Sequence, residues 1–279
     1  MKNKTVYIWM VAATALFSAC DKHEFVIPVV IEPEPEMVSV TYILPADLPE
    51  GTEVRLTESH DMPVATALPL PSKLSPDTYT LQLITPHPGV TVSPAGEASL
   101  TPAPDGEIQS APLFSQSLTT FTVESGKPAQ VSPELRLMSR EVKLTVNIDG
   151  SSPSVIEECS MMLTGVAAKR DVPTRAGTAD GYYIKAAAPK SGDGYVASFR
   201  LLAMQPGATA TLTVYVKIKG EAEPRTFTQD AGAFLADFNT GDYATAVSFH
   251  LDLSVKNEGA MSGTIIPWDE EQDIPLAGK

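Results

Sequence analysis

The segment Arg140-Glu141-Val142-Lys143-Leu144-Thr145-Val146-Asn147-Ile148 decides the fold, because apolar and polar residues alternate along it. Successive side chains of a β-strand point to opposite faces, so the segment predicts a strand with one buried and one solvent-exposed face. The same alternation returns at 211–218 and 247–253. Strands of this kind are typical of antiparallel sheets that pack face to face.

Shorter alternating runs extend the pattern towards the N-terminus, at 38–42, 80–83 and 120–123. Turn-forming residues separate the runs, as in Ser191-Gly192-Asp193-Gly194, which predicts a hairpin turn. Many short strands at this spacing predict an all-β sandwich protein.

The chain has 279 residues, of which 43% are hydrophobic, so it can bury the cores of two ordinary domains. We expect a signal peptide at 1–19 and a tether at 20–36. An N-terminal β-sandwich at 37–136 and a C-terminal β-sandwich with an extension at 137–279 should follow. The proline-rich segment 86–112 is expected to be a long loop of the N-terminal sandwich. Short helices near 153–158 and 231–238 stay open.

The first residues predict a bacterial lipoprotein signal. Lys2 and Lys4 give a positive start, and the apolar run 6–17 follows. The run is too short to span a bilayer comfortably, which favours a cleaved signal over an anchor helix. Since small residues precede a cysteine, we expect cleavage between Ala19 and Cys20 and attachment of lipid to the Cys20 thiol. An ordinary secretory signal that contains a cysteine is the alternative.

A charged cluster follows and resembles the signal that exports Bacteroidetes lipoproteins to the outer face of the outer membrane. The cluster consists of Asp21, Lys22, His23 and Glu24. Glu32-Pro33-Glu34-Pro35-Glu36 then predicts an extended tether, because alternate prolines favour polyproline II and the glutamates repel one another. We therefore expect surface exposure and attachment to the outer membrane through an N-terminal lipid.

The balance of charge argues against nucleic-acid binding. The chain carries 20 basic and 34 acidic residues, a formal net charge of −14, and a chain this acidic repels phosphate backbones. The sequence lacks nucleophile-elbow, phosphate-loop and dinucleotide-binding motifs, and its four histidines are scattered. We expect no catalytic residue, no metal, no cofactor and no enzymatic activity.

Some residues have both a structural and a functional interpretation. Asp237-Phe238-Asn239-Thr240-Gly241-Asp242 is similar to the start of a calcium loop, but Ser248 stands where the closing glutamate belongs, so a plain turn is favoured. Cys159 is expected to be a small buried residue rather than a catalytic thiol. Trp268 either packs a terminal strand onto the core or stacks on a sugar.

The tyrosines and histidines receive structural predictions. The tyrosines expected to pack within strands are Tyr182, Tyr183, Tyr195 and Tyr215. The histidines expected at the solvated surface are His23, His60, His87 and His250.

Taken in chain order, the motifs resemble a known family. The lipoprotein signal and acidic proline tether precede Leu74-Ser75-Pro76-Asp77-Thr78-Tyr79-Thr80-Leu81, Arg140–Val146, Met161-Met162-Leu163-Thr164-Gly165-Val166 and Phe238-Asn239-Thr240-Gly241-Asp242-Tyr243. This layout resembles the fimbrillin-related anchor and accessory lipoproteins of Bacteroidales fimbriae. The resemblance implies two tandem transthyretin-like antiparallel β-sandwiches.

The resemblance also implies a function. Such a protein anchors, caps or decorates a fimbria, with fimbrial subunits as partners and a β-strand as the contact. The segments 243–255 and 265–276 are the candidate docking strands. The alternative is a glycan-binding accessory lipoprotein of an outer-membrane polysaccharide uptake system.

Overall fold

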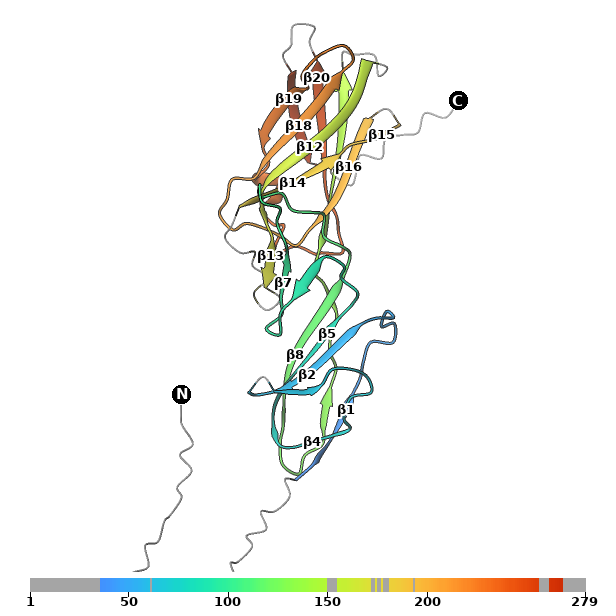
Figure 1. Ribbon diagram of the computed structural model, residues 1–279, viewed down its shortest axis with the longest axis vertical. Coiled ribbons are helices and arrows are strands. Elements are labelled where there is room, and N and C mark those ends of the chain that lie inside the picture. Colours follow the sequence, from blue (N-terminus) through green and yellow to red (C-terminus); the bar gives the residue numbers. More distant parts are fainter. Residues whose placement is uncertain are drawn as a thin grey trace, which may run out of the picture. The chain divides into compact units, whose positions relative to one another are not determined.

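The alternating segments form strands in the computed structural model, which describes residues 36–60, 62–149, 155–171, 174, 177, 181–192, 194–255 and 261–267. The alternating segment 140–148 lies in β11 (Arg140–Asp149), which buries Val142, Leu144 and Val146. Within the described residues, the regular elements are strands (Figure 1), the short 3-10 helix η2 (Ala233–Leu235), and a 3-10 residue at Val155. The all-β prediction and a short helix at 231–238 are therefore confirmed.

Two sheets enclose a first hydrophobic core. The smaller sheet has the order β4 (Lys73–Leu74), β1 (Val38–Tyr42), β9 (Ala129–Val131). The larger sheet has the order β10 (Arg136–Leu137), β8 (Ser115–Val123), β5 (Asp77–Ile84), β2 (Glu53–Glu58), β3 (Pro63–Ala65). Val38 and Val40 of β1 and Leu81 of β5 belong to this core, so both sheets contribute to it.

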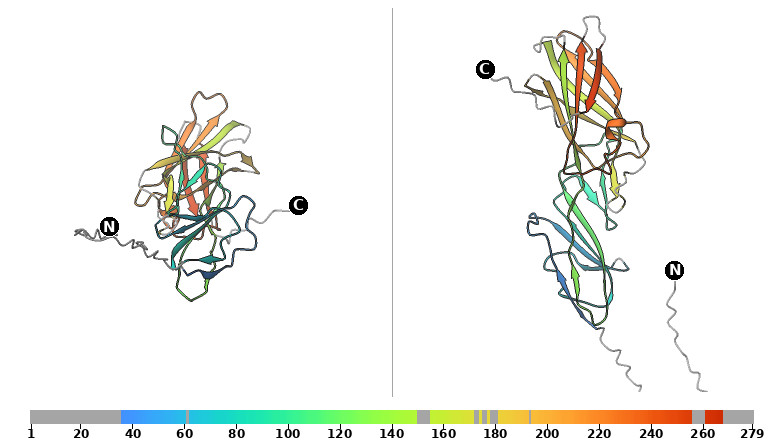
Figure 2. Two further views of the ribbon diagram at one scale, coloured as in Figure 1. Left: turned by 60° about the horizontal axis from the view of Figure 1, so that its bottom comes forward. Right: turned by 180° about the vertical axis from the view of Figure 1, so that it is seen from behind.

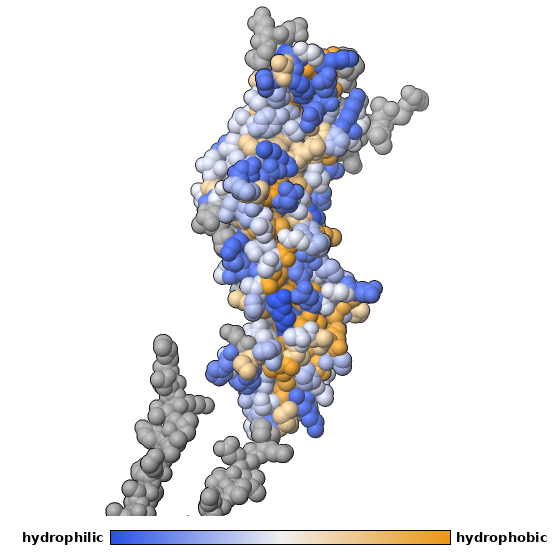
Figure 3. All heavy atoms as spheres, viewed as in Figure 1, coloured by the Kyte–Doolittle hydropathy of each residue, from blue (hydrophilic) through white to orange (hydrophobic). Residues whose placement is uncertain are grey.

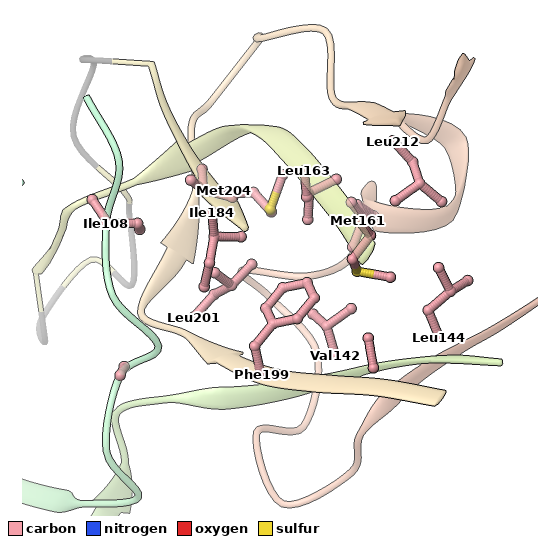
Figure 4. Packing of buried hydrophobic residues seen from close by; sticks show 14 of the residues in the cluster. Ile108, Val142, Leu144, Met161, Leu163, Ile184, Phe199, Leu201, Met204 and Leu212 are labelled. Atoms are coloured by element: carbon pink, nitrogen blue, oxygen red, sulfur yellow. The ribbon is translucent and has the colours of Figure 1, made fainter. Parts of the chain in front are cut away.

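Two further sheets enclose a second core. One has the order β15 (Lys190–Ser191), β16 (Gly194–Leu201), β11, β20 (Val247–Val255), β21 (Met261–Pro267). The other has the order β14 (Tyr182–Ala187), β12 (Ile156–Ala167), β18 (Thr211–Ile218), β19 (Arg225–Asp230), with β17 (Ala203–Met204) also paired to β12. Figure 4 shows Phe199 of one sheet opposite Met161 and Leu163 of the other.

Two strand pairs are parallel, which the antiparallel prediction did not include. β1 runs parallel to β9, with Val40 beside Ala129, and β11 runs parallel to β20, with Val142 beside Val247. In each core an early strand therefore lies beside a late one. This repeated connection supports the predicted tandem, while the boundary at 136/137 stays a prediction, since the described residues from Glu36 onwards belong to one compact unit.

The segment 86–112 is not the long loop that its prolines predict. It contains β6 (Val90–Val92) and β7 (Glu97–Leu100), and β7 pairs with β13 (Lys169–Asp171). Ala98 of β7 is buried in the second core rather than the first. These strands have 3 and 4 residues, too few to reveal a period between prolines.

Of the range 153–158, where a short helix was left open, Val155 is 3-10 helical and Ile156–Glu158 begin β12, while 153 and 154 lie outside the described residues. The buried residues Cys159, Met161 and Leu163 then follow at every second position, which is the period of a strand.

The surface mixes polar and apolar residues, as Figure 3 shows for one face. Figure 2 shows β20 and β21 side by side at the edge of their sheet. No helix in the described part of the chain is both long and apolar enough to cross a membrane.

Candidate interaction surface

A strand-mediated contact needs a strand with a free edge, and β8 has one. On one side β8 pairs with β5 along most of its length. On the other side β10 covers only Ser115 and Gln116. Among the residues that the structure describes, no strand pairs with 117–123 on that side.

A hydrogen bond fixes the direction of the backbone groups along this edge. The N–H of Thr85 donates to the carbonyl of Ser115 at 3.0 Å, on the side of β5. Alternate residues of an antiparallel strand turn their backbone groups to opposite sides. The N–H and C=O groups of Leu118, Thr120 and Thr122 therefore point to the open side.

A groove of about 440 Å³ runs along this edge, and we call it the edge groove. Its residues come from β8, from the connection between β9 and β10, and from β10 itself. They are Gln116, Ser117, Leu118, Thr119, Thr120, Ser132, Glu134 and Arg136.

The edge groove is polar and balanced in charge. The Ser117 and Thr119 hydroxyl oxygens lie 3.2 Å apart. Arg136 Nη2 donates to Glu134 Oε2 at 3.1 Å, so the groove's guanidinium and carboxylate neutralise each other. Gln116 is fully buried, and its Oε1 accepts no hydrogen bond from any described residue. The arrangement can pair a backbone and bind hydroxyl or amide groups.

A second hollow, of about 530 Å³, lies on the outer face of β14, β12 and β18, and we call it the tyrosine hollow. Its residues are Glu158, Ser160, Met161, Lys185, Ala186, Ala187, Tyr215, Lys217 and Pro224. The Tyr215 hydroxyl lies 3.9 Å from Met162 Sδ. Lys217 Nζ donates to the carbonyls of Glu221 and Ala222 at 2.6 and 2.5 Å, which holds its ammonium group at one end.

Tyr183 of β14 makes hydrogen bonds to the neighbouring segment that contains Asp105 and Ile108. Its hydroxyl donates to Asp105 Oδ2 at 2.6 Å, and its carbonyl accepts the N–H of Ile108 at 2.9 Å. The hydrogen bond to Asp105 is the main reason that the pKa of Tyr183 rises to about 12. The same bond lowers the pKa of Asp105. The role of Tyr183 is therefore structural.

The predicted packing role of the tyrosines is correct for Tyr195, which is buried, and for Tyr182, which packs against the second core. Tyr183 and Tyr215 lie instead on the outer face of the sheet, since they pair across β12 with Thr164 and Ser160. Alternation places them on the face opposite Ile184 and Val214.

The loop Asp237–Tyr243 surrounds a guanidinium. Arg140 Nη1 donates to the carbonyls of Asp237 at 3.3 Å and Phe238 at 3.2 Å, and its Nε donates to the carbonyl of Thr245 at 2.8 Å. A Cβ on Gly241 would lie 2.9 Å from the Asp237 carbonyl oxygen, so a side chain there would shift the backbone of the loop. The predicted turn is confirmed, whereas the contact of Arg140 with the loop was not predicted.

Cys159 is buried, as predicted. Burial is the main cause that raises the pKa of its thiol to about 12. A thiol held neutral is a poor nucleophile, so the residue serves packing.

Two histidines are less solvated than predicted. The side chain of His87 is 12% exposed, its Nδ1–H donates to the Thr85 carbonyl at 2.9 Å, and its ring lies against Phe114. That of His250 is 19% exposed and contacts Asn147 and Asp252. Neighbouring polar groups on the strands cover it, which alternation alone does not reveal.

One predicted docking strand is wrong. β20, the strand within 243–255, lies between β11 and β21 and has no free edge. Alternation reveals which face is buried but not how many neighbours a strand has. The other candidate begins in β21, which ends its sheet, and the remainder, 268–276, lies outside the described residues. So do Ala19, Cys20 and Trp268, and the cluster Asp21, Lys22, His23 and Glu24.

Several solved structures have folds similar to that of this chain. The chain is similar to the fimbrial anchor protein Mfa2 from Porphyromonas gingivalis, with 14% identity, a TM-score of 0.51, and coverage of 84% of this chain and 98% of that one. It shares its fold with a fimbrial anchor protein. The predicted resemblance is thus confirmed at the level of fold.

Two other structures are similar. A candidate adhesin from Bacteroides ovatus is 11% identical, with a TM-score of 0.54 over 88% of this chain and 96% of that one. A candidate polysaccharide-binding protein from Bacteroides thetaiotaomicron is 7% identical, with a TM-score of 0.52 over 84% of this chain and 99% of that one. No family profile and no curated protein sequence matches the chain.

Proposed function

We propose that the chain is a cell-surface lipoprotein that anchors, caps or decorates a fimbria through a β-strand contact with fimbrial subunits. The observation that carries the proposal is the free edge of β8 on a sandwich whose first strand, β1, is already in place between β4 and β9. The fold that the chain shares with a fimbrial anchor supports it.

The position of β1 suits a membrane-held subunit. β1 begins at Val38, directly after the predicted tether, and buries Val38 and Val40 in the first core. A lipid on Cys20 would therefore be joined to a strand with neighbours on both sides. Diacylglycerol and a further acyl chain on that cysteine would give stable attachment, because each buried methylene contributes about 0.8 kcal/mol.

Lipid labelling and purification of sheared filaments test the proposal. Cells grown with a labelled fatty acid are compared with a Cys20→Ala strain, and filaments are sheared and analysed by mass spectrometry. We expect label on the wild-type protein only, and the protein itself among the filament subunits. Absence of the protein from every filament fraction would refute the fimbrial role.

Glycan binding is the second candidate, and the tyrosine hollow favours it. Tyr215 offers an aromatic ring beside Glu158, Ser160 and Lys217, a combination that suits stacking on a sugar and hydrogen bonding to its hydroxyls. Binding to a panel of polysaccharides, compared between the wild type and Tyr215→Ala, tests this function. Equal retention of both proteins by every polysaccharide would count against it.

A further inference from the structure

We infer that the edge groove takes an extended segment of a fimbrial subunit whose groove-facing side chains are small and polar. The segment adds a strand to β8 while β1 stays in its place. This inference rests on the proposed function and names the chemistry of the partner.

The backbone provides the first part of the recognition. Leu118, Thr120 and Thr122 each direct an N–H and a C=O to the open side, so an added strand finds donors and acceptors at every second residue. β10 ends this open stretch at Gln116. The partner segment therefore lies beside 118–122 and does not continue along 115–116.

The side chains of the groove determine which segment fits. Thr119 and Thr120 have hydroxyls that can make more than the one contact each, with Ser117 and Thr80, that the structure gives them. Covering them with leucine or phenylalanine would remove water from these groups without supplying new hydrogen bonds. Serine, threonine or asparagine supplies such bonds.

Charge disfavours an acidic partner segment. The groove's only described charges, Glu134 and Arg136, already pair with each other. The chain as a whole carries a formal net charge of −14. An acidic segment, such as this chain's own stretch with Asp269, Glu270, Glu271 and Asp273, would therefore be repelled, so the occupant is a neutral segment of another subunit.

A proline substitution tests the added strand. Thr120→Pro removes an N–H that faces the open side and keeps the backbone hydrogen bonds to β5, while the contact of the Thr120 hydroxyl with that of Thr80 is lost. The matched control is Thr226→Pro on β19, the last strand of its sheet. The Ala231 N–H donates to the Ala210 carbonyl, on the side of β18, so alternation along β19 turns the Thr226 N–H to the open side. Thr120→Lys is a second edge variant that introduces charge instead of proline.

The measurement is the amount of each variant in sheared filaments of cells that produce it at wild-type level. We expect at least a tenfold loss for Thr120→Pro and Thr120→Lys, and wild-type amounts for Thr226→Pro. Wild-type amounts of both edge variants would overturn the inference. A wild-type protein that is itself absent from filaments would instead refute the proposed function.

A photoreactive side chain at Leu118 tests the chemistry of the partner. We expect one cross-linked peptide, from a fimbrial subunit, with serine, threonine or asparagine at alternate positions. Exchange of Thr119 for valine should weaken the cross-link. A cross-linked peptide that is acidic, that has apolar residues at those positions, or that comes from a second copy of this chain would overturn the inference.

Discussion

Arg140 Nη1 donates to the backbone carbonyl of Phe238 at 3.2 Å, and the guanidinium carbon lies 5.5 Å from the centroid of the Phe238 ring. Through this contact the first residue of β11 binds the loop that precedes β20. β11 and β20 are parallel neighbours, and parallel strands cannot be joined by a tight turn. Arg140 therefore helps to set where the chain returns beside β11.

Replacing Arg140 with methionine should destabilise the protein by about 2–4 kcal/mol, because three carbonyls lose a charged donor. Urea unfolding measures the change. The control is Arg136→Met, which breaks a surface ion pair and should cost at most about 1 kcal/mol. Equal losses for both variants would show that the loop does not depend on the guanidinium.

Gly165 allows β12 to change partners. It has a φ of +73° at an irregularity in the pairing, between the part of β12 that meets β18 and the part that meets β17. An added Cβ would lie 3.2 Å from the Ala210 Cα. Gly165→Ala should therefore cost about 2–3 kcal/mol, from left-handed backbone strain and crowding together.

Gly207 separates these two effects, since it has a φ of +72° and nothing within 4 Å of an added Cβ. Gly207→Ala should cost about 1 kcal/mol, from backbone strain alone. Thermal melting of both variants measures the difference. If Gly207→Ala is as destabilising as Gly165→Ala, the close approach to Ala210 contributes nothing.

Asp242 makes the stability depend on acid pH. The Ala244 N–H and the Thr245 hydroxyl donate to its carboxylate and lower its pKa below the ordinary value of 3.8. A carboxyl whose pKa is lower in the folded state stabilises above the unfolded-state pKa, and this contribution is lost as the pH falls through the folded-state pKa.

The melting temperature of Asp242→Asn should therefore fall less than that of the wild type below pH 4, while the variant is less stable near pH 7. Melting curves between pH 2.5 and pH 7 test this expectation. Parallel curves for the two proteins would contradict the role of the carboxylate.

Cys159 should not react in the folded protein. Its pKa of about 12 and its burial keep the thiol neutral and covered at pH 8. Alkylation with iodoacetamide should proceed only after denaturant is added. Thr226→Cys provides an exposed thiol as the control. Rapid labelling of Cys159 in native protein would show that the second core opens readily.

The alternation of β11, β18 and β20 made the second core predictable, because period two identifies a buried face directly. Which strands lie side by side in a sheet could not be predicted in the same way. β20 has the pattern of a one-sided strand, yet it is an inner strand beside β21.

The edge groove was missed for a related reason. Ser117 and Thr119 break the apolar pattern of β8, so only its second half, 120–123, could be predicted as a strand. Its free edge arises because β10 has only 2 residues, a length that no periodicity reveals. Arg140 was missed because its three acceptors are backbone carbonyls about a hundred residues further along the chain, at Asp237, Phe238 and Thr245.

The central proposal is that this protein, lipidated at Cys20, anchors, caps or decorates a fimbria. The most direct test is the amount of fimbrial filament released into the medium by a Cys20→Ala strain, compared with wild-type cells. The account predicts that filaments appear in the medium and carry the unlipidated protein. Filaments that stay on the cell as in the wild type, with the altered protein absent from them, would contradict it.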